Sequence, residues 1–107
     1  VIGDLNDTPD SDPLSPLLKH GGMTDAFTHP AFDDGGFKGT YGLCNPGNKI
    51  DYLLLSPKLL DKVEKGGVIR TGMWPGSRPK RWDTYDELKR QQDAASDHAA
   101  LWVDIDI

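Results

Sequence analysis

The stretch Lys49-Ile50-Asp51-Tyr52-Leu53-Leu54-Leu55-Ser56 is the most apolar part of this 107-residue sequence and gives the first indication of its fold. A nearly continuous apolar run bounded by turn signals is typical of a strand buried on both faces. Asp51 is the exception in that run, and it needs a partner because burying an unpaired charge is costly. Two interpretations are open: a structural salt bridge or backbone cap, or a carboxylate that orients an imidazole.

A second apolar run, residues 101–107, directly follows Ser96-Asp97-His98. If this run is a strand, Asp97 and His98 lie at its N-terminal end. Adjacent residues of a strand point to opposite faces, so one side chain could bind a metal while the other faces a substrate. This pair is informative only if other parts of the chain bring matching groups to the same edge.

The chain opens with Val1-Ile2-Gly3, which reads as the end of a buried strand, followed by Asp4-Leu5-Asn6. In an extended segment, the side chains of Asp4 and Asn6 leave the same face. A carboxylate beside an amide could polarise a water molecule and hold a phosphoryl oxygen. Taken alone, this stretch favours a simpler interpretation, an Asx-turn that caps the strand.

The other elements expected from the sequence are short. Residues 10–22 predict a capped helix with Pro in its first turn, and residues 83–90 predict a second short capped helix. Residues 68–70 read as a strand, and residues 59–65 as a helical turn or an edge strand. Residues 72–82 form a loop with two tryptophans and three bases, which either contacts a substrate or packs its tryptophans on the core.

Composition limits the class of protein. The length fits one domain or part of one, and 27% charged with 36% hydrophobic residues fits a globular chain. The net charge of −5 is uneven, because seven acids and one base lie in residues 1–34 whereas nine bases and five acids lie in residues 58–90. No apolar run approaches the roughly 20 residues that span a membrane. The single Cys44 is expected to be a buried small hydrophobe, and the compartment, secreted or cytoplasmic, stays open.

Three motifs then carry a resemblance: Gly3-Asp4-Leu5-Asn6, residues 49–56 and Ser96-Asp97-His98. Their order and spacing resemble the C-terminal half of the endonuclease/exonuclease/phosphatase superfamily, which has the deoxyribonuclease-like fold. The resemblance covers essentially all of residues 1–107. It implies an α+β fold: half of a four-layer α/β/β/α sandwich, with one mainly antiparallel mixed sheet and flanking short helices.

The resemblance also implies a function, the magnesium-dependent hydrolysis of phosphate esters, and assigns roles to five residues. Asp4 would activate or position the attacking water, and Asn6 would donate a hydrogen bond to the scissile phosphate. Asp51 would pair with the ring of His98, which would contact the phosphate, and Asp97 would help to hold the metal. The chemistry agrees, because phosphoryl transfer needs a positioned nucleophile, a metal and donors aimed at the transition state. Mg²⁺ is the expected ion, with Mn²⁺ or Ca²⁺ as alternatives.

The departure from the family pattern leads to two hypotheses. Family members place a metal-binding glutamate, an asparagine and a further tyrosine or histidine in an N-terminal half that this sequence does not supply. We therefore expect residues 1–107 to be a fragment of a longer enzyme, a phosphodiesterase or nuclease, and to be inactive alone. The alternative is a non-catalytic, self-associating module that retains the family scaffold.

The expected partners follow from these hypotheses. They are a phosphate-ester substrate such as nucleic acid, the missing half of the same domain, and a second copy bound through an exposed sheet face. The substrate itself is not determined, because DNA, RNA, inositol phosphates and lipid phosphodiesters are all cleaved within the superfamily. The acidic composition argues mildly against tight binding to DNA irrespective of its sequence.

Overall fold

Strand β4 (Asp51–Leu55) is the centre of the fold, and its side chains from Tyr52 to Leu55 are all buried. The computed structural model describes residues 1–76 and 81–107. Strands β1 (Ile2–Asp4) and β2 (Thr24–Asp25) pair antiparallel with β4, one on each side. The expected strand with two buried faces is therefore confirmed.

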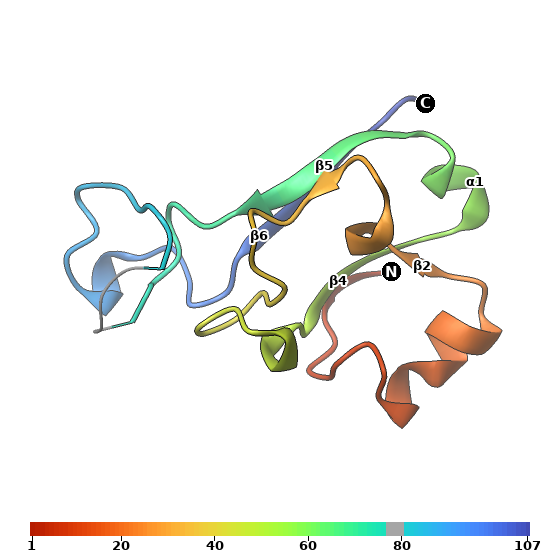
Figure 1. Ribbon diagram of the computed structural model, residues 1–107, viewed down its shortest axis with the longest axis horizontal. Coiled ribbons are helices and arrows are strands. Elements are labelled where there is room, and N and C mark those ends of the chain that lie inside the picture. The colour runs from red at the N-terminus through yellow and green to blue at the C-terminus, as the bar shows by residue number, and fades with distance from the viewer. Residues whose placement is uncertain (77–80) are drawn as a thin grey trace.

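A second sheet contains β3 (Phe32–Asp33), β5 (Val63–Ile69) and β6 (Ala100–Ile105), in the order β3-β5-β6. Strand β3 is parallel to β5, and β5 is antiparallel to β6 (Figure 1). The α+β class is confirmed, but the expectation of one mixed sheet is wrong, because the six strands form two three-stranded sheets.

The second sheet packs on β4 through one face of β6. Every second residue of β6 is partly buried, so the strand has one apolar face. That face meets Leu53 and Leu55 in a single core cluster, to which β6 contributes Leu101, Val103 and Ile105. The inner face of β4 is thus covered by another part of the same chain.

The segment expected to be one helix over residues 10–22 is divided into two short turns. These are the 3₁₀ helix η1 (Asp12–Leu14) and the π-helical turn η2 (Pro16–His20). Pro16 explains the division, since proline has no N–H to continue the hydrogen-bond ladder. Leu14, with Leu17 and Leu18, still packs on Tyr52 and Leu54, so the outer face of β4 is covered as the apolar spacing requires.

The expected helix over residues 83–90 is wrong. This segment is irregular with one turn at Asp86-Glu87, and among the described residues it is followed by the 3₁₀ helix η5 (Gln91–Asp93). The expected cap at the start of this segment does not initiate a helix. Instead, the Asp93 carboxylate of η5 accepts hydrogen bonds from the backbone N–H groups of Lys89 and Arg90. Only Leu88 is buried here, and a short helix without an apolar face is marginal in water.

The remaining short elements complete the core. Helix α1 (Pro57–Leu60) begins at Ser56, whose side chain accepts from Leu59 N–H, and the 3₁₀ helices η3 (Ala26–Thr28) and η4 (Pro46–Asn48) flank β4.

Cys44 is 2% exposed, as expected of a small hydrophobe, and burial raises the pKa of its thiol despite the nearby arginines. None of the described helices has the length and apolar character needed to cross a bilayer.

A buried cation lies beside β4. Lys49 is 5% exposed, its Nζ lies 3.1 Å from Oδ2 of Asp25, and it also donates to the carbonyl of Asp51. The ammonium sits 3.5 Å from the ring centroid of Tyr52 and 4.4 Å from that of Phe27. Burial lowers the pKa of Lys49, although Asp25 opposes that shift.

Candidate active site

Two carboxylates face each other across the first sheet. Asp4 at the end of β1 is the register partner of Asp51 at the start of β4. Like charges directly opposite in an antiparallel pair destabilise it unless something compensates them. A positive group at this edge would therefore stabilise the two carboxylates.

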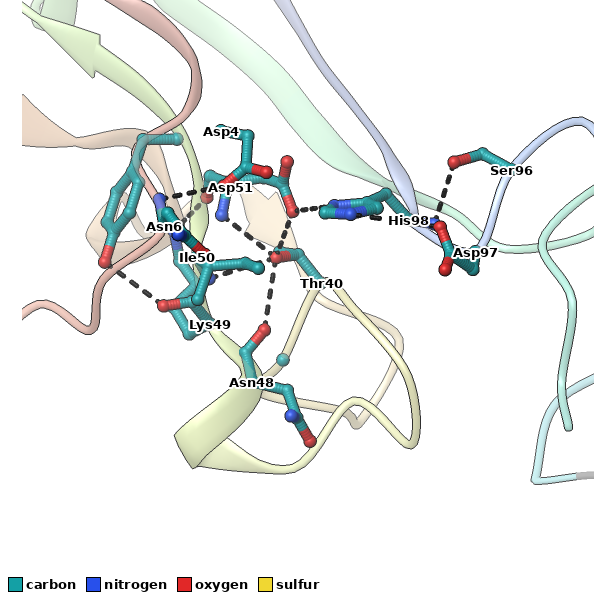
Figure 2. Close-up of polar contacts among 12 residues, drawn as sticks. Asp4, Asn6, Thr40, Asn48, Lys49, Ile50, Asp51, Ser96, Asp97 and His98 are labelled. Carbon is teal, nitrogen blue, oxygen red and sulfur yellow. Dashed lines mark hydrogen bonds and ion pairs between the residues drawn. The ribbon is translucent and has the colours of Figure 1, made fainter.

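His98 supplies one such group. Its Nδ1 lies 2.9 Å from Oδ2 of Asp51, and the His98 and Asp51 side chains are only 28% and 15% exposed (Figure 2). This contact gives Asp51 the imidazole partner that an orienting carboxylate requires, and with a protonated ring it is also a salt bridge, the other interpretation made from sequence. The expectation that His98 precedes a strand is also confirmed, because β6 begins two residues later.

The charges around the ring control its protonation. Burial lowers the pKa of His98, but the hydrogen bond and charge of Asp51 outweigh that effect, with smaller contributions from Asp4 and Asp97. The net result is a pKa above the ordinary value of the imidazole. The site therefore favours a positive ring near its two carboxylates.

Thr40 joins the two halves of this arrangement, although no sequence motif singled it out as a site residue. The residue is fully buried, and its hydroxyl lies 2.7 Å from Oδ2 of Asp51. Its backbone accepts from Ala99 N–H at 2.8 Å and donates to the carbonyl of Asn48 at 3.0 Å. The next residue, Tyr41, bridges to His98, and their ring centroids are 4.8 Å apart. The segment thus fixes the position of His98 relative to β4.

Asn6 lies in a turn directly after β1. Its backbone φ is 56°, in the left-handed region, and its N–H donates to Oδ1 of Asp4 at 2.8 Å. This is the Asx-turn that the stretch alone favoured, and it holds Asp4 in place. The side chains of Asp4 and Asn6 are therefore neighbours on a turn, not on an extended strand as the spacing rule assumed.

Asp97 lies on the other side of the imidazole. Its Oδ1 is 3.9 Å from Nε2 of His98, and its side chain is 48% exposed. In Figure 2 the His98 ring lies between Asp97 and the Asp4–Asp51 pair. The Ser96 hydroxyl accepts from His98 N–H at 2.9 Å and so supports the turn that carries both side chains.

Three side chains at this sheet edge could bind a metal ion. Among the described residues, Asp4, Asp51 and His98 each offer one ligand atom, and these atoms lie within 4.8 Å of one another. Carboxylate oxygens suit a hard divalent cation, and Mg²⁺ needs only one or two of them because it keeps several waters. The donor chemistry fits such an ion. Asp97, which the sequence analysis assigned to the metal, is not one of the three.

The loop over residues 72–82 is only partly described, because residues 77–80 lie outside the described residues. Trp82 packs on the core cluster of Cys44, Met73 and Ala99 and makes an edge contact with Phe37. Of the two interpretations of this loop, packing on the core holds for Trp82.

Comparison with known proteins identifies the family. The sequence model of the Endonuclease/Exonuclease/phosphatase family matches residues 1–98, so the chain belongs to this family. No curated protein and no solved structure matches the chain. The match spans the three motifs from Asp4 to His98, and it assigns the chain a scaffold of the phosphoesterase and nuclease type.

Proposed function

We propose that the chain contributes the catalytic groups for metal-dependent hydrolysis of phosphate esters, as part of a longer phosphodiesterase or nuclease. The observation that carries this proposal is the meeting of Asp4, Asp51 and His98 at one sheet edge, with His98 Nδ1 bonded to Asp51. Family membership adds to it, because the three motifs lie in the matched region.

Each residue has a role that its surroundings support. Asp4, exposed and fixed by the Asn6 turn, would position the attacking water and accept its proton. Asn6 would donate its side-chain amide to a phosphoryl oxygen. His98 has its Nδ1 engaged by Asp51, which leaves Nε2 to donate to the phosphate when the ring is protonated.

A divalent cation completes the proposal. Asp4 would contribute a carboxylate from the donor set at the sheet edge, and Asp97, on the other side of the His98 ring, would help to hold the waters of the ion. Mg²⁺ is the expected ion, with Mn²⁺ or Ca²⁺ as alternatives. When bound, the ion supplies Lewis-acid stabilisation of the phosphoryl oxygens. The chain's own groups then hold the water and donate hydrogen bonds to the charge that develops.

The test is hydrolysis of bis(4-nitrophenyl) phosphate with Mg²⁺ by the polypeptide that carries residues 1–107 with the remainder of its domain. His98→Ala and Asp97→Ala should each lower turnover by roughly 10²- to 10⁴-fold, the usual range for a lost acid–base or charge-stabilising group. The control is His20→Ala, since His20 lies on η2, away from the site motifs. EDTA should abolish wild-type turnover, and full activity of both site variants would refute the assignment.

A second candidate function, a non-catalytic module that associates with itself, rests on a different observation. Ile2 on the edge strand β1 is 78% exposed, and Val1, which precedes this strand, is 52% exposed. The 107-residue chain alone separates the candidates. EDTA-sensitive hydrolysis by the isolated chain would exclude a purely structural role, whereas we expect it to show little or none.

A further inference from the structure

The hydroxyl of Thr40 has a more specific part in the site than its burial alone suggests. It accepts hydrogen bonds from the backbone N–H groups of Ile50, at 3.2 Å, and Asp51, at 3.0 Å. A threonine hydroxyl has one proton and two lone pairs. With both lone pairs occupied, the proton has to be donated.

Two acceptors compete for that proton. Oδ2 of Asp51 is 2.7 Å away, whereas the carbonyl of Asn48 is 3.3 Å away and already accepts from the Thr40 backbone N–H. Hydrogen bonds from a hydroxyl to a carboxylate are short and strong. The geometry therefore directs the proton of Thr40 to Asp51.

The same carboxylate oxygen faces the imidazole. Oδ2 of Asp51 is 2.9 Å from Nδ1 of His98, so this oxygen contacts the Thr40 hydroxyl on one side and the imidazole on the other. An oxygen held in this way by a donor presents its remaining lone pair to Nδ1–H. In a neutral histidine, the hydrogen bond made by one nitrogen decides which nitrogen carries the proton.

We propose that Thr40 is a positioning residue: its hydroxyl orients the Asp51 carboxylate so that neutral His98 keeps its proton on Nδ1 and leaves the lone pair of Nε2 free. Thr40 does not touch the reacting atoms; it acts through Asp51. Its importance for catalysis rests on the proposed function, but the arrangement of protons exists in the chain without substrate.

The backbone around Thr40 is held by hydrogen bonds that do not involve its hydroxyl. The Thr40 carbonyl accepts from Ala99 N–H, and Gly42 N–H donates to the Asp97 carbonyl at 3.3 Å, so both flanks of His98 are tied to this segment. Arg70, 6% exposed, donates to the carbonyl of Gly39 at 3.0 Å and holds the preceding residue. These backbone bonds do not use the hydroxyl, so the path of residues 39–42 should survive its removal, although the N–H groups of Ile50 and Asp51 then lose their acceptor.

The experiment is ¹⁵N NMR of the imidazole in the 107-residue chain, in metal-free buffer at an alkaline pH where the ring is neutral. In the wild type, Nδ1 should resonate as a protonated nitrogen and Nε2 as an unprotonated one. Thr40→Val removes the hydroxyl at nearly constant shape and should shift the ring towards the Nε2–H tautomer that free histidine favours. Thr40→Ser, which retains the hydroxyl, should restore the wild-type pattern.

The matched control is Thr8→Val, since the Thr8 hydroxyl also donates to an aspartate, Oδ1 of Asp10 at 2.8 Å, but outside the site. It should leave the His98 signals unchanged. An Nε2–H tautomer in the wild type, an unshifted Thr40→Val, or a shifted Thr40→Ser would each overturn the inference. If Thr40→Val does not fold, Thr40→Ala, which also lacks the hydroxyl, replaces it, and an unshifted tautomer in that variant would overturn the inference. Loss of hydrolysis with an unchanged tautomer would count against the Thr40 inference and leave the proposed function standing.

Discussion

At the scale of single residues, the pairing of Asp51 with His98 makes the fold depend on pH. Burial alone would lower the pKa of His98, but Asp51 raises it above the ordinary value in the folded chain. A group whose pKa is raised by folding stabilises the fold when protonated. This stabilisation is fully present below the pH at which the unfolded histidine titrates, near 6.5, and is lost as pH rises through the raised pKa of the folded state.

The first prediction is that Asp51→Asn lowers the pKa of His98, because the neutral amide removes the charge that favours the imidazolium. An NMR titration of the His98 ring measures this directly. Asp61→Asn, an exposed substitution at the end of α1, should leave the titration curve unchanged. An unaltered His98 curve in Asp51→Asn would show that the pair does not control the ring.

The site residues differ in how far the sequence could predict them. Asp4, Asp51 and His98 were predicted together, because each motif is local and their order matched a family. Thr40 was missed, because its contacts with Asp51 and Ala99 join residues 11 and 59 positions away, and a lone threonine before a tyrosine has no local signature. The Asx-turn was the simpler interpretation of the stretch around Asn6, and the left-handed backbone of Asn6 and its N–H bond to Asp4 confirm that turn.

At the scale of elements, β5 depends on a close approach of its neighbours. A Cβ placed on Gly66 would lie 2.6 Å from the Phe32 side chain and 3.0 Å from that of Val103. Both neighbours pack on the cluster around Leu53 and Leu55, which limits how far they can move. The glycine therefore permits β3 and β6 to pack on either side of β5.

The second prediction is that Gly66→Ala destabilises the chain by about 1–3 kcal/mol, the usual cost of overpacking a core. The control is Gly47→Ala, where an added Cβ would meet no heavy atom within 4 Å. Urea denaturation with matched m-values measures the difference. Equal midpoints for the two variants would mean that β5 can shift away from Phe32 at little cost.

The expectations for the elements failed where tertiary packing decides. Strands β1, β4 and β6 were predicted because their apolar runs are local signals. The expectation that β1 is buried is wrong, because it is an edge strand on which Ile2 is 78% exposed. The division of residues 12–20 at Pro16 and the absence of a helix at 83–90 follow from backbone and packing effects that capping motifs do not report. The sequence could not distinguish two sheets from one. The apolar alternation of β6 predicts which face of the strand is buried, but it does not predict which strand β6 pairs with.

At the scale of the whole molecule, the edge of the first sheet is apolar and accessible. Strand β1 ends the sheet order β1-β4-β2, and Ile2 on it is 78% exposed. Edge strands offer unpaired backbone groups, and apolar side chains beside them favour pairing with another chain.

The third prediction is that the 107-residue chain associates with itself as its concentration rises and that Ile2→Lys weakens this association. A lysine on an edge strand disfavours pairing because its charge would have to be desolvated. Static light scattering over a wide concentration range measures the mass. Lys58→Ala, an exposed change on α1, should behave as the wild type. A constant monomer mass for the wild-type chain would argue against the predicted pairing.

The buried ammonium of Lys49 has a practical consequence for chemical labelling. Amine-reactive reagents need a solvent-accessible, neutral amine, and Lys49 Nζ is enclosed by Asp25, Tyr52 and Phe27. Lys38, whose side chain is 71% exposed, will be acylated quickly by comparison. The rate at which Lys49 is modified, measured by peptide mass spectrometry, therefore reports how often the first sheet opens.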